Sequence, residues 1–290
     1  MNTNPEYIIR LACANRPGIV AAVATALFEG GFNILDSQQF DDTVSDRFFV
    51  RIHFEQTRAH AEIDIGTLMA PVADRFGMQY SVHDCRKLSR VLLMVSKFDH
   101  CLADLLYRWR TGELAMDVVG IISNHPRDTY AHLNLGDIPF HHLPIDKNAP
   151  NGKVEQEQRV WQAVQSSGAE LVVLARYMQI LSDDLSAKLA GKCINIHHSF
   201  LPGFKGAKPY HQAHERGVKL IGATAHYVTA DLDEGPIIEQ DVERISHRDT
   251  PEQLVRRGRD IERRVLASAV RYHLEGRVLL NGQKTVVFPG

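Results

Sequence analysis

The sequence predicts two α/β domains, a small domain over residues 1–85 and a larger domain over residues 86–290. Three observations lead to this prediction. The chain of 290 residues exceeds the commonest size of a single domain. Its first part alternates amphipathic strand patterns with helical patterns, whereas its later part carries near-continuous apolar runs separated by helical segments. Strands that bury one face are therefore expected in the first domain, and parallel strands that bury both faces are expected in the second.

The first domain is expected to have the element order βαββαβ. The turn formers Asn15 to Gly18 precede a helix whose apolar residues Ile19, Val23 and Leu27 share one face, and Gly30 can end that helix. The order is that of the ferredoxin-like split βαβ arrangement. The expected elements are a strand at 7–13, a helix at 19–30, strands at 32–40 and 46–54, a helical run at about 60–76 that is broken near Pro71, and a strand at 78–84.

The second domain follows a linker at about residues 85–89. Its apolar runs predict strands at 90–96, 116–123, 169–175 and 192–196, with helices at 99–109, 154–166 and 183–189 between them. A long helix is expected from Pro251 to about His273. The tail at 277–288 has Asn281-Gly282 between two apolar runs, which predicts a closing hairpin.

Charge and composition exclude several classes of function. The formal net charge is -2, so the chain has no excess of positive charge with which to neutralise a nucleic-acid backbone, and no nucleic-acid partner is expected. No apolar stretch approaches the roughly 20 residues that span a bilayer, so neither a membrane role nor a signal segment is expected, and a cytoplasmic location follows as the expectation. The four cysteines have no C-x-x-C spacing and are expected to be reduced thiols; they are Cys13, Cys85, Cys101 and Cys193.

A candidate catalytic centre stands at the end of the fourth parallel strand. The strand period of two places Ile194 and Ile196 on one face and Asn195 and His197 on the other. Open α/β sheets bind ligands at the carboxyl ends of their strands. A second strand runs into an acidic loop that carries Asp233. An amide and an imidazole can stabilise an oxyanion and a carboxylate can move protons, which favours acyl chemistry without a covalent nucleophile.

The two motifs that carry these residues resemble the folate-dependent formyltransferase superfamily. They are INIHHSFLPGFKG at 194–206 and DLDEGPII at 231–238, and most of the chain after about residue 88 follows the family pattern. The resemblance implies a formyltransferase-type parallel α/β sheet, 10-formyltetrahydrofolate as substrate, and no cofactor. The segment 175–181 is similar to the loop that lines the pterin site. The folate-binding residues that the resemblance implies are Tyr177, Met178, Gln179, Ile180, Leu181, Val228 and Asp231.

The same resemblance implies individual catalytic roles. Asn195 and His197 look like the pair that binds the oxyanion, Asp233 looks like the residue that transfers protons, and His226 matches a histidine that supports it. The chain departs from the pattern at one position, because close relatives have His-Pro-Ser where this chain has His-His-Ser. The additional His198 has no implied role and is expected to be a partly exposed loop histidine.

The identity of the formyl acceptor separates the members of the superfamily. Glycinamide ribonucleotide formyltransferases bind a substrate phosphate at a glycine-rich turn after the first strand. This chain has Val95 to Cys101 there, without such a turn, and Asp99 is expected to cap the helix and repel an anion. An anionic nucleotide acceptor is therefore disfavoured. A small α/β domain in front of this core resembles the layout of superfamily members in which water replaces the amine, which implies hydrolysis to formate and tetrahydrofolate. Formyl transfer to an amine and a non-catalytic amino-acid sensor are the alternatives.

The first domain resembles the ACT domain of amino-acid-regulated proteins. The resemblance rests on the turn at 15–19 together with Asn33-Ile34 and covers roughly the first 85 residues. It implies an effector such as glycine or methionine, and a homo-oligomer because such modules pair between chains. A module that only mediates oligomerisation is the alternative. The residues implied for the effector site are Asn15, Gly18, Ile19, Asn33 and Ile34.

A metal-dependent hydrolase is the main rival in mechanism, because many of the 15 histidines gather in the second half of the chain. No H-E-x-x-H or two-histidine-carboxylate spacing accompanies them, and the loop at 231–235 does not complete a calcium-binding pattern. No metal is therefore expected. The histidines concerned are His197, His198, His211, His214 and His226.

Overall fold

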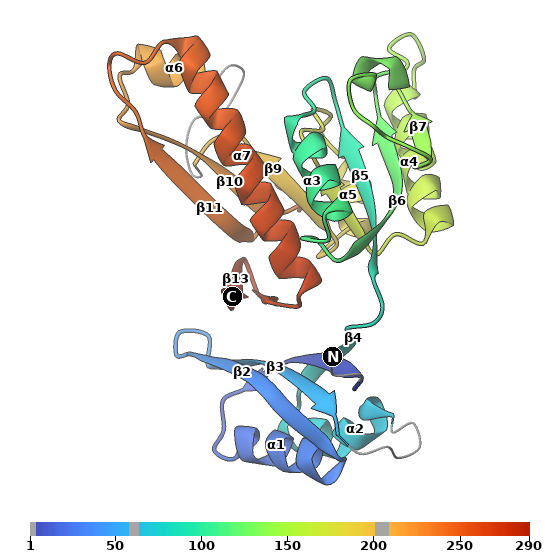
Figure 1. Ribbon diagram of the computed structural model, residues 1–290, viewed down its shortest axis with the longest axis vertical. Coiled ribbons are helices and arrows are strands. Elements are labelled where there is room, and N and C mark those ends of the chain that lie inside the picture. Colours follow the sequence, from blue (N-terminus) through green and yellow to red (C-terminus); the bar gives the residue numbers. More distant parts are fainter. Residues whose placement is uncertain (1–3, 58–63, 201–208) are drawn as a thin grey trace. The chain divides into compact units, whose positions relative to one another are not determined.

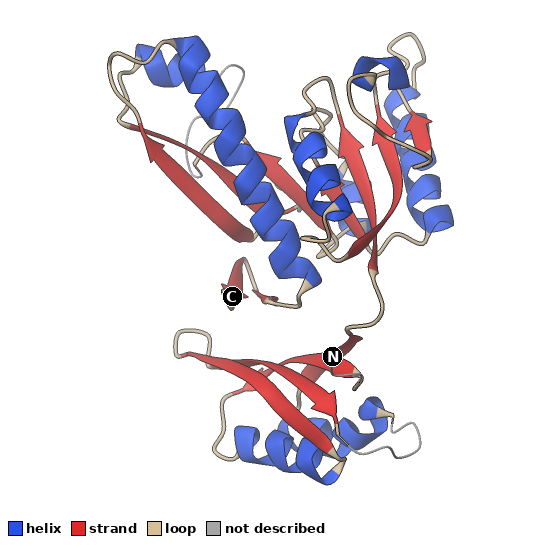
Figure 2. Cartoon of the chain, in the orientation of Figure 1, coloured by secondary structure: helices blue, strands red, loops and turns tan. Residues whose placement is uncertain are grey.

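The computed structural model describes residues 4–57, 64–200 and 209–290 (Figures 1 and 2). The chain forms two compact units. The first contains Met1–Leu88 together with the tail segments Glu275–Asn281 and Val286–Gly290, and the second contains Ser89–Leu274 and Gly282–Thr285. Both termini of the chain therefore belong to the first unit.

The first unit is a four-stranded antiparallel sheet with two helices. Its elements are β1 (Glu6–Ala14), α1 (Ile19–Glu29), β2 (Phe32–Asp42), β3 (Arg47–Gln56), α2 (Ile65–Phe76) and β4 (Gln79–Asp84), in the sheet order β2-β3-β1-β4. The expected βαββαβ order is confirmed. Central strands β1 and β3 are not adjacent in sequence, which is the signature of the split βαβ arrangement.

The helices of this unit bury an apolar stripe against one face of its sheet. Val23 and Leu27 of α1 and Met69 of α2 pack with strand residues such as Leu11 and Ile52. The expected break of the second helix near Pro71 is wrong, because α2 continues through this residue. The helix begins at Ile65, where the Asp64 side chain accepts from two backbone N–H groups, and it ends at Gly77. Part of the helical run expected from residue 60 lies outside the described residues.

The chain's own tail covers the other face of this sheet. Ala12 and Phe49 point away from the helices and pack with Leu279 and Phe288. The tail forms the hairpin β12 (Val278–Asn281) and β13 (Lys284–Val287), as its sequence predicts. The apolar area that these four side chains remove from water contributes to holding the tail on the sheet.

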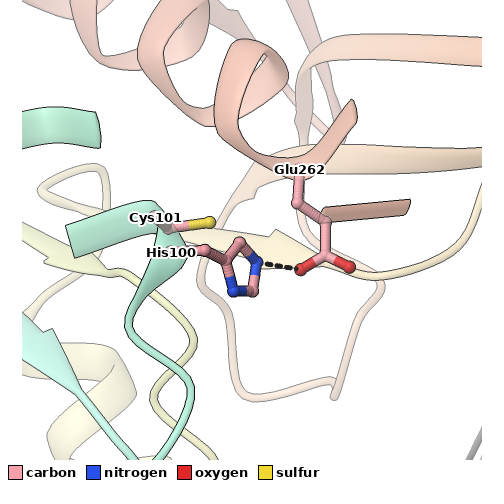
Figure 3. A group of neighbouring side chains, drawn as sticks. All are labelled: His100, Cys101 and Glu262. Atoms are coloured by element: carbon pink, nitrogen blue, oxygen red, sulfur yellow. Dashed lines mark hydrogen bonds and ion pairs between the residues drawn. The ribbon is translucent and has the colours of Figure 1, made fainter. Parts of the chain in front are cut away.

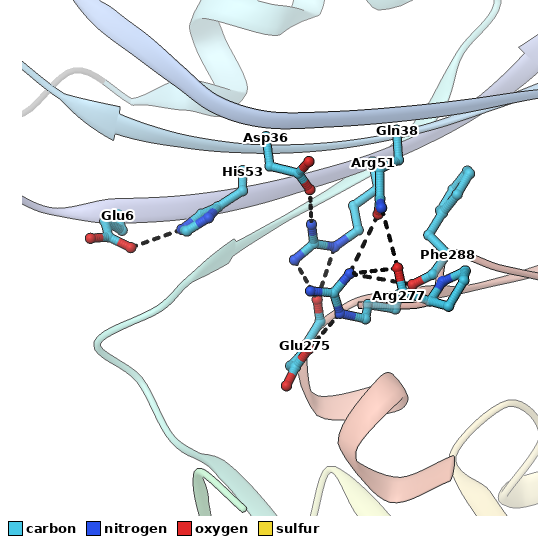
Figure 4. A network of polar contacts seen from close by, with 9 residues as sticks. Glu6, Asp36, Gln38, Arg51, His53, Glu275, Arg277 and Phe288 are labelled. Carbon is cyan, nitrogen blue, oxygen red and sulfur yellow. Dashed lines mark hydrogen bonds and ion pairs between the residues drawn. The ribbon is translucent and has the colours of Figure 1, made fainter. Parts of the chain in front are cut away.

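A buried arginine fixes the start of this tail (Figure 4). Arg51 is only 3% exposed, and its guanidinium donates to the backbone oxygen of Glu275 from two nitrogens, at 3.1 Å each, and to Asp36 at 3.1 Å. Arg277 donates to Gln38 and to the backbone oxygen of Phe288. Since a buried charge without partners would be costly, this network makes the tail an integral part of the first unit.

The second unit is built on a seven-stranded sheet. Its elements are β5 (Ser89–Val95), α3 (His100–Arg110), β6 (Met116–Ser123), the 3-10 helix η1 (Arg127–Tyr130), β7 (Phe140–His142), α4 (Gly152–Ser167), β8 (Leu171–Leu174), α5 (Asp183–Lys188), β9 (Cys193–His197), α6 (Pro209–Glu215), β10 (Leu220–Tyr227), β11 (Ile237–Arg244) and α7 (Pro251–Leu274). The sheet order is β11-β10-β9-β8-β5-β6-β7. The four predicted strands β5, β6, β8 and β9 are parallel, as expected, and the unpredicted β7 pairs in parallel with β6. Strands β10 and β11 join antiparallel at the edge next to β9.

Helices cover both faces of this sheet. Leu92 and Met94 of β5 pack with Val160 of α4 and Leu185 of α5. Strand alternation turns Leu93 to the opposite face, where α3 and α7 lie side by side (Figure 1). Helix α7 also packs against β9 and β10, the two strands that carry the candidate catalytic residues. Among the described residues no helix is both long and apolar enough to cross a membrane.

Candidate active site

Pairing between β9 and β10 brings Asn195 and His226 together. The two residues are register partners in the antiparallel ladder, and the Asn195 amide lies 3.3 Å from Nε2 of His226. Nδ1 of His226 lies 2.9 Å from the backbone oxygen of Tyr227, which can only accept, so Nδ1 carries the hydrogen. In the tautomer with its hydrogen on Nδ1, Nε2 accepts one amide hydrogen of Asn195. This bond fixes the amide and leaves its second hydrogen available for a ligand.

The loop after β10 carries Asp233 to His197. The Asp233 backbone has φ 58°, a left-handed conformation that aspartate tolerates better than most residues. Two residues later, a side chain at Gly235 would place its Cβ 1.8 Å from the backbone oxygen of Tyr227, so only glycine fits there. With the loop so held, Oδ1 of Asp233 lies 3.2 Å from Nδ1 of His197 and 3.7 Å from Nε2 of His226.

Electrostatics keep Asp233 ionised. Its burial raises the pKa of the carboxyl group, but the hydrogen bond from His197 outweighs this effect, so the net pKa lies well below the usual 3.8. His197 is 6% exposed and bonds Asp233 through Nδ1, while its buried Nε2 has no hydrogen-bond partner among the described residues. An unpaired buried nitrogen beside a cavity is suited to a ligand atom that completes its hydrogen bonding.

These groups line one cavity, which has a volume of about 320 Å³. This volume suits a small-molecule ligand. Asn195, His197, His226 and Asp233 line it together, so the structure brings the four residues of the predicted catalytic centre to one place. The residues implied for folate binding also line it; they are Tyr177, Met178, Gln179, Ile180, Leu181, Val228 and Asp231. Met178 and Ile180 are 52% and 60% exposed, which leaves apolar surface uncovered at the mouth of the cavity.

His198 also lines this cavity, where the sequence predicted a loop histidine without a role. Its ring centroid lies 5.0 Å from that of His197. Burial, followed by the charges of Arg176 and His197, lowers its pKa from 6.5 to about 4, so the ring is neutral at physiological pH. The next residue, Ser199, is buried, and its backbone oxygen accepts from Thr224. Of the loop expected at 199–206, residues 201–206 lie outside the described residues.

Sequence reasoning missed a buried charge cluster behind the cavity. Arg176, also at a left-handed φ of 66°, lines the cavity, and its Nε lies 3.2 Å from Glu262 of α7. Glu262 is 1% exposed and accepts from His100 at 2.9 Å (Figure 3). It also accepts from Tyr210 at 2.7 Å. One feature of the sequence could have revealed this cluster: Glu262 follows Ile261 among the apolar residues that α7 buries, and a glutamate is rarely buried without a partner.

The cluster also contains the one group of potential metal ligands among the described residues, formed by His100, Cys101 and Glu262. It does not fit a cation well. Both carboxylate oxygens of Glu262 already accept hydrogen bonds, and the Arg176 guanidinium supplies a positive charge beside them. Burial raises the pKa of the Cys101 thiol, which disfavours the thiolate that binds metals. All four cysteines of the chain are free, as the sequence predicts.

The turn after β5 differs in detail from expectation. Asp99 occupies the N-cap position of α3, but its side chain makes no capping hydrogen bond. Its carboxylate instead lies 2.6 Å from Nε2 of His132, which brings a residue from beyond η1 back to this turn. The acidic charge at the start of α3 is therefore present, as predicted, but a tertiary contact sets the direction of the side chain.

The residues implied for an effector site lie around the start of α1 and the start of β2. Gly18 has φ 92°, a left-handed conformation in which a side chain would be strained, and it directly precedes buried Ile19. Asn33 donates its side-chain amide to Glu55 at 3.2 Å, and Ile34 packs on the core of the unit. Asn15 donates its backbone N–H to the turn before β3.

Comparisons with known proteins agree with this geometry. The family described as formyl transferase matches residues 89–270, and the family described as ACT domain matches residues 7–64. The chain therefore joins an ACT domain to a formyl transferase domain.

Relatives that align with nearly the whole chain identify the family more narrowly. A formyltetrahydrofolate deformylase of Corynebacterium sp. (strain P-1) is 48% identical over 288 residues, which cover 99% of each chain. The crystal structure of formyltetrahydrofolate deformylase from Burkholderia mallei superposes with a TM-score of 0.88 at 53% identity, covering 98% of this chain and 99% of that one. The chain belongs to the formyltetrahydrofolate deformylase family. Glycinamide ribonucleotide transformylase 1 from Symbiobacterium toebii has a TM-score of 0.63 at 30% identity and covers 69% of this chain and 94% of its own.

Proposed function

We propose that this protein hydrolyses 10-formyltetrahydrofolate to formate and tetrahydrofolate. The single observation that carries the proposal is the contact between His197 and Asp233 beside Asn195, in a cavity that the loop at 175–181 also lines. The membership of the chain in the formyltetrahydrofolate deformylase family supports the substrate. The apolar side chains of Met178 and Ile180 offer a surface on which the pterin ring packs.

Asn195 and His197 hold the oxygen of the formyl group in this mechanism. Water attacks the formyl carbon, and negative charge develops on the formyl oxygen as the tetrahedral intermediate forms. Asn195 donates its second amide hydrogen, because the first is engaged by His226. His197 acts as an imidazolium in this mechanism: Nδ1 donates to Asp233, and Nε2, the nitrogen without a partner among the described residues, donates to the formyl oxygen. Both donors are fixed before the reaction, which is what makes such groups effective.

Asp233 orients the water and transfers its proton. Because its pKa is lowered, Asp233 is a carboxylate throughout the neutral range and is always available as an acceptor. A carboxylate with a low pKa is a weak base, so it holds the proton only in transit to the leaving nitrogen of the folate. The carbon–nitrogen bond then breaks, and formate leaves as an anion. No metal or cofactor takes part in these steps.

Formyl transfer to an amine is the second candidate, because a transformylase shares the fold of the second unit. Incubation of the purified protein with 10-formyltetrahydrofolate alone separates the two. Hydrolysis predicts stoichiometric formate and tetrahydrofolate without any added amine. Formate release that depends on an amine acceptor would overturn the proposal.

We further propose that the ACT domain binds a small amino acid, glycine or methionine, near Gly18 and Asn33, and that the protein is a homo-oligomer. The match to the ACT family supports this. A change in melting temperature or hydrolysis rate on titration with either amino acid is the expected result. No response to either amino acid would contradict the effector site, and a monomeric mass by light scattering would contradict the oligomer.

A further inference from the structure

His198 is a polar residue of the cavity to which neither the family motif nor the mechanism above gives a role. It lines the cavity together with His197 and Arg176, and its ring centroid lies 5.0 Å from that of His197. The charged and titratable groups that act on it are Arg176, His197, Glu262 and Asp233. They come from the segment after β8, from β9, from α7 and from the loop after β10, so His198 stands where these elements meet.

The Arg176–Glu262 pair gives this histidine a fixed electrostatic environment. Glu262 holds Arg176 at 3.2 Å and is itself held by His100 and Tyr210. These side chains are largely buried, so the guanidinium is not free to swing away. Burial of the imidazole, and then the fixed positive charge beside it, disfavour protonation of the ring. A neutral imidazole has one nitrogen that can accept a hydrogen bond, whereas an imidazolium has none.

We propose that His198 accepts a hydrogen bond from the attacking water and is the residue that selects water as the nucleophile. Arg176 and Glu262 act through it as positioning residues. This inference rests on the proposed hydrolysis. A water molecule has two O–H groups, and it donates one to the Asp233 carboxylate and the other to His198, which leaves a lone pair directed at the formyl carbon.

The proton balance is unchanged by His198. The water oxygen forms the new bond to carbon, Asp233 carries one proton to the leaving nitrogen, and the carbon–nitrogen bond breaks. His198 only accepts a hydrogen bond and takes no net proton. The second water proton leaves with formic acid and is released to solvent at neutral pH.

Three substitutions at one position test this role. His198→Leu removes the acceptor at similar volume, whereas His198→Asn and His198→Gln keep an oxygen acceptor. We expect His198→Leu to lower kcat for formate release by about 100-fold with KM for 10-formyltetrahydrofolate changed less than threefold. The amide variants should recover at least about tenfold of this loss. The matched control His247→Leu, at an exposed histidine of the same unit, should behave as wild type.

Competition between water and hydroxylamine for the formyl group gives a product ratio that a purely structural role of His198 would leave unchanged. With hydroxylamine added, the ratio of formohydroxamate to formate should rise at least about tenfold in His198→Leu, because only the water has lost its acceptor. In Arg176→Gln the pKa of His198 should rise, so the acid limb of kcat should move to higher pH. An unchanged limb would overturn the positioning role.

The outcomes distinguish this inference from the proposed function. If wild-type protein releases no formate from 10-formyltetrahydrofolate, hydrolysis itself fails. If wild-type protein releases formate but His198→Leu keeps kcat within threefold and an unchanged nucleophile ratio, only the role of His198 is overturned. Equal loss of kcat in the leucine and both amide variants would also overturn it.

Discussion

Replacement of Glu262 by glutamine should destabilise the second unit strongly. Glu262 is 1% exposed, and its carboxylate accepts from Tyr210 and His100 and pairs with Arg176. Glutamine preserves the volume but removes the charge and replaces one acceptor with an NH2 donor. The buried Arg176 guanidinium is then left without its counter-ion. Breaking a buried pair in this way costs about 3–5 kcal/mol, against a total stability of roughly 5–15 kcal/mol for a domain.

Tryptophan fluorescence during urea unfolding measures this loss selectively. The chain has two tryptophans, Trp109 in α3 and Trp161 in α4, and both lie in the second unit. The control is Glu243→Gln, which breaks a partly exposed pair with Arg257 at 3.4 Å and should cost less than about 1 kcal/mol. If Glu262→Gln unfolds within 1 kcal/mol of wild type, the inference that this cluster is a fixed structural element is refuted.

Four further outcomes are expected. Asp233→Asn should lower turnover by at least about 100-fold while the affinity for tetrahydrofolate, measured by calorimetry, changes little. Asn195→Ala should lower turnover about 100- to 1000-fold with less than 1 kcal/mol change in stability, read from urea unfolding. Gly235→Ala should abolish formate release, because its Cβ would lie 1.8 Å from the Tyr227 backbone oxygen and displace the loop. The pKa of His198 is near 6.5 in the unfolded chain and about 4 in the native protein, so the unfolded chain binds the proton first as pH drops. The free energy of unfolding should therefore fall by up to about 3 kcal/mol between these two pH values, and His198→Gln should remove this part of the pH dependence.

A specific result would contradict each of these four expectations. Near wild-type turnover of Asp233→Asn would show that another group moves the proton. Unfolding of Asn195→Ala would indicate a structural role for the amide. Normal activity of Gly235→Ala would mean that the loop can shift without displacing the carboxylate. Identical pH dependence of stability in wild type and His198→Gln would contradict the depressed pKa of that histidine.

Local periodicity was enough to predict which side chains of β9 share a face. Strand alternation alone places Asn195 and His197 on the face opposite Ile194 and Ile196, and the end of a strand is a position that sequence can define. The acidic loop with Asp233 was recognisable from its turn formers. Its distance from His197 was not, because that distance depends on the pairing of β9 with β10 and on the close approach of the loop at Gly235.

Contacts between segments that are far apart in the chain could not be predicted from the sequence. Arg176 and Glu262 are 86 residues apart, and nothing local to either one indicates that they meet. The contact of Arg51 with the backbone of Glu275 is likewise a tertiary event, 224 residues apart in sequence. The helix-breaking tendency of Pro71 was overridden, because packing of α2 on the sheet can outweigh a local propensity. Local patterns thus predict elements and faces, whereas charge pairing across the fold requires the structure.

Isotope labelling of the product tests the central claim most directly. In a single turnover of 10-formyltetrahydrofolate in water enriched in oxygen-18, attack by water at the site of Asn195, His197 and Asp233 predicts that each formate carries one labelled oxygen. The Asp233→Asn variant should form almost none in the same time. Formate without the label, or a formyl group recovered on an amine, would contradict the account.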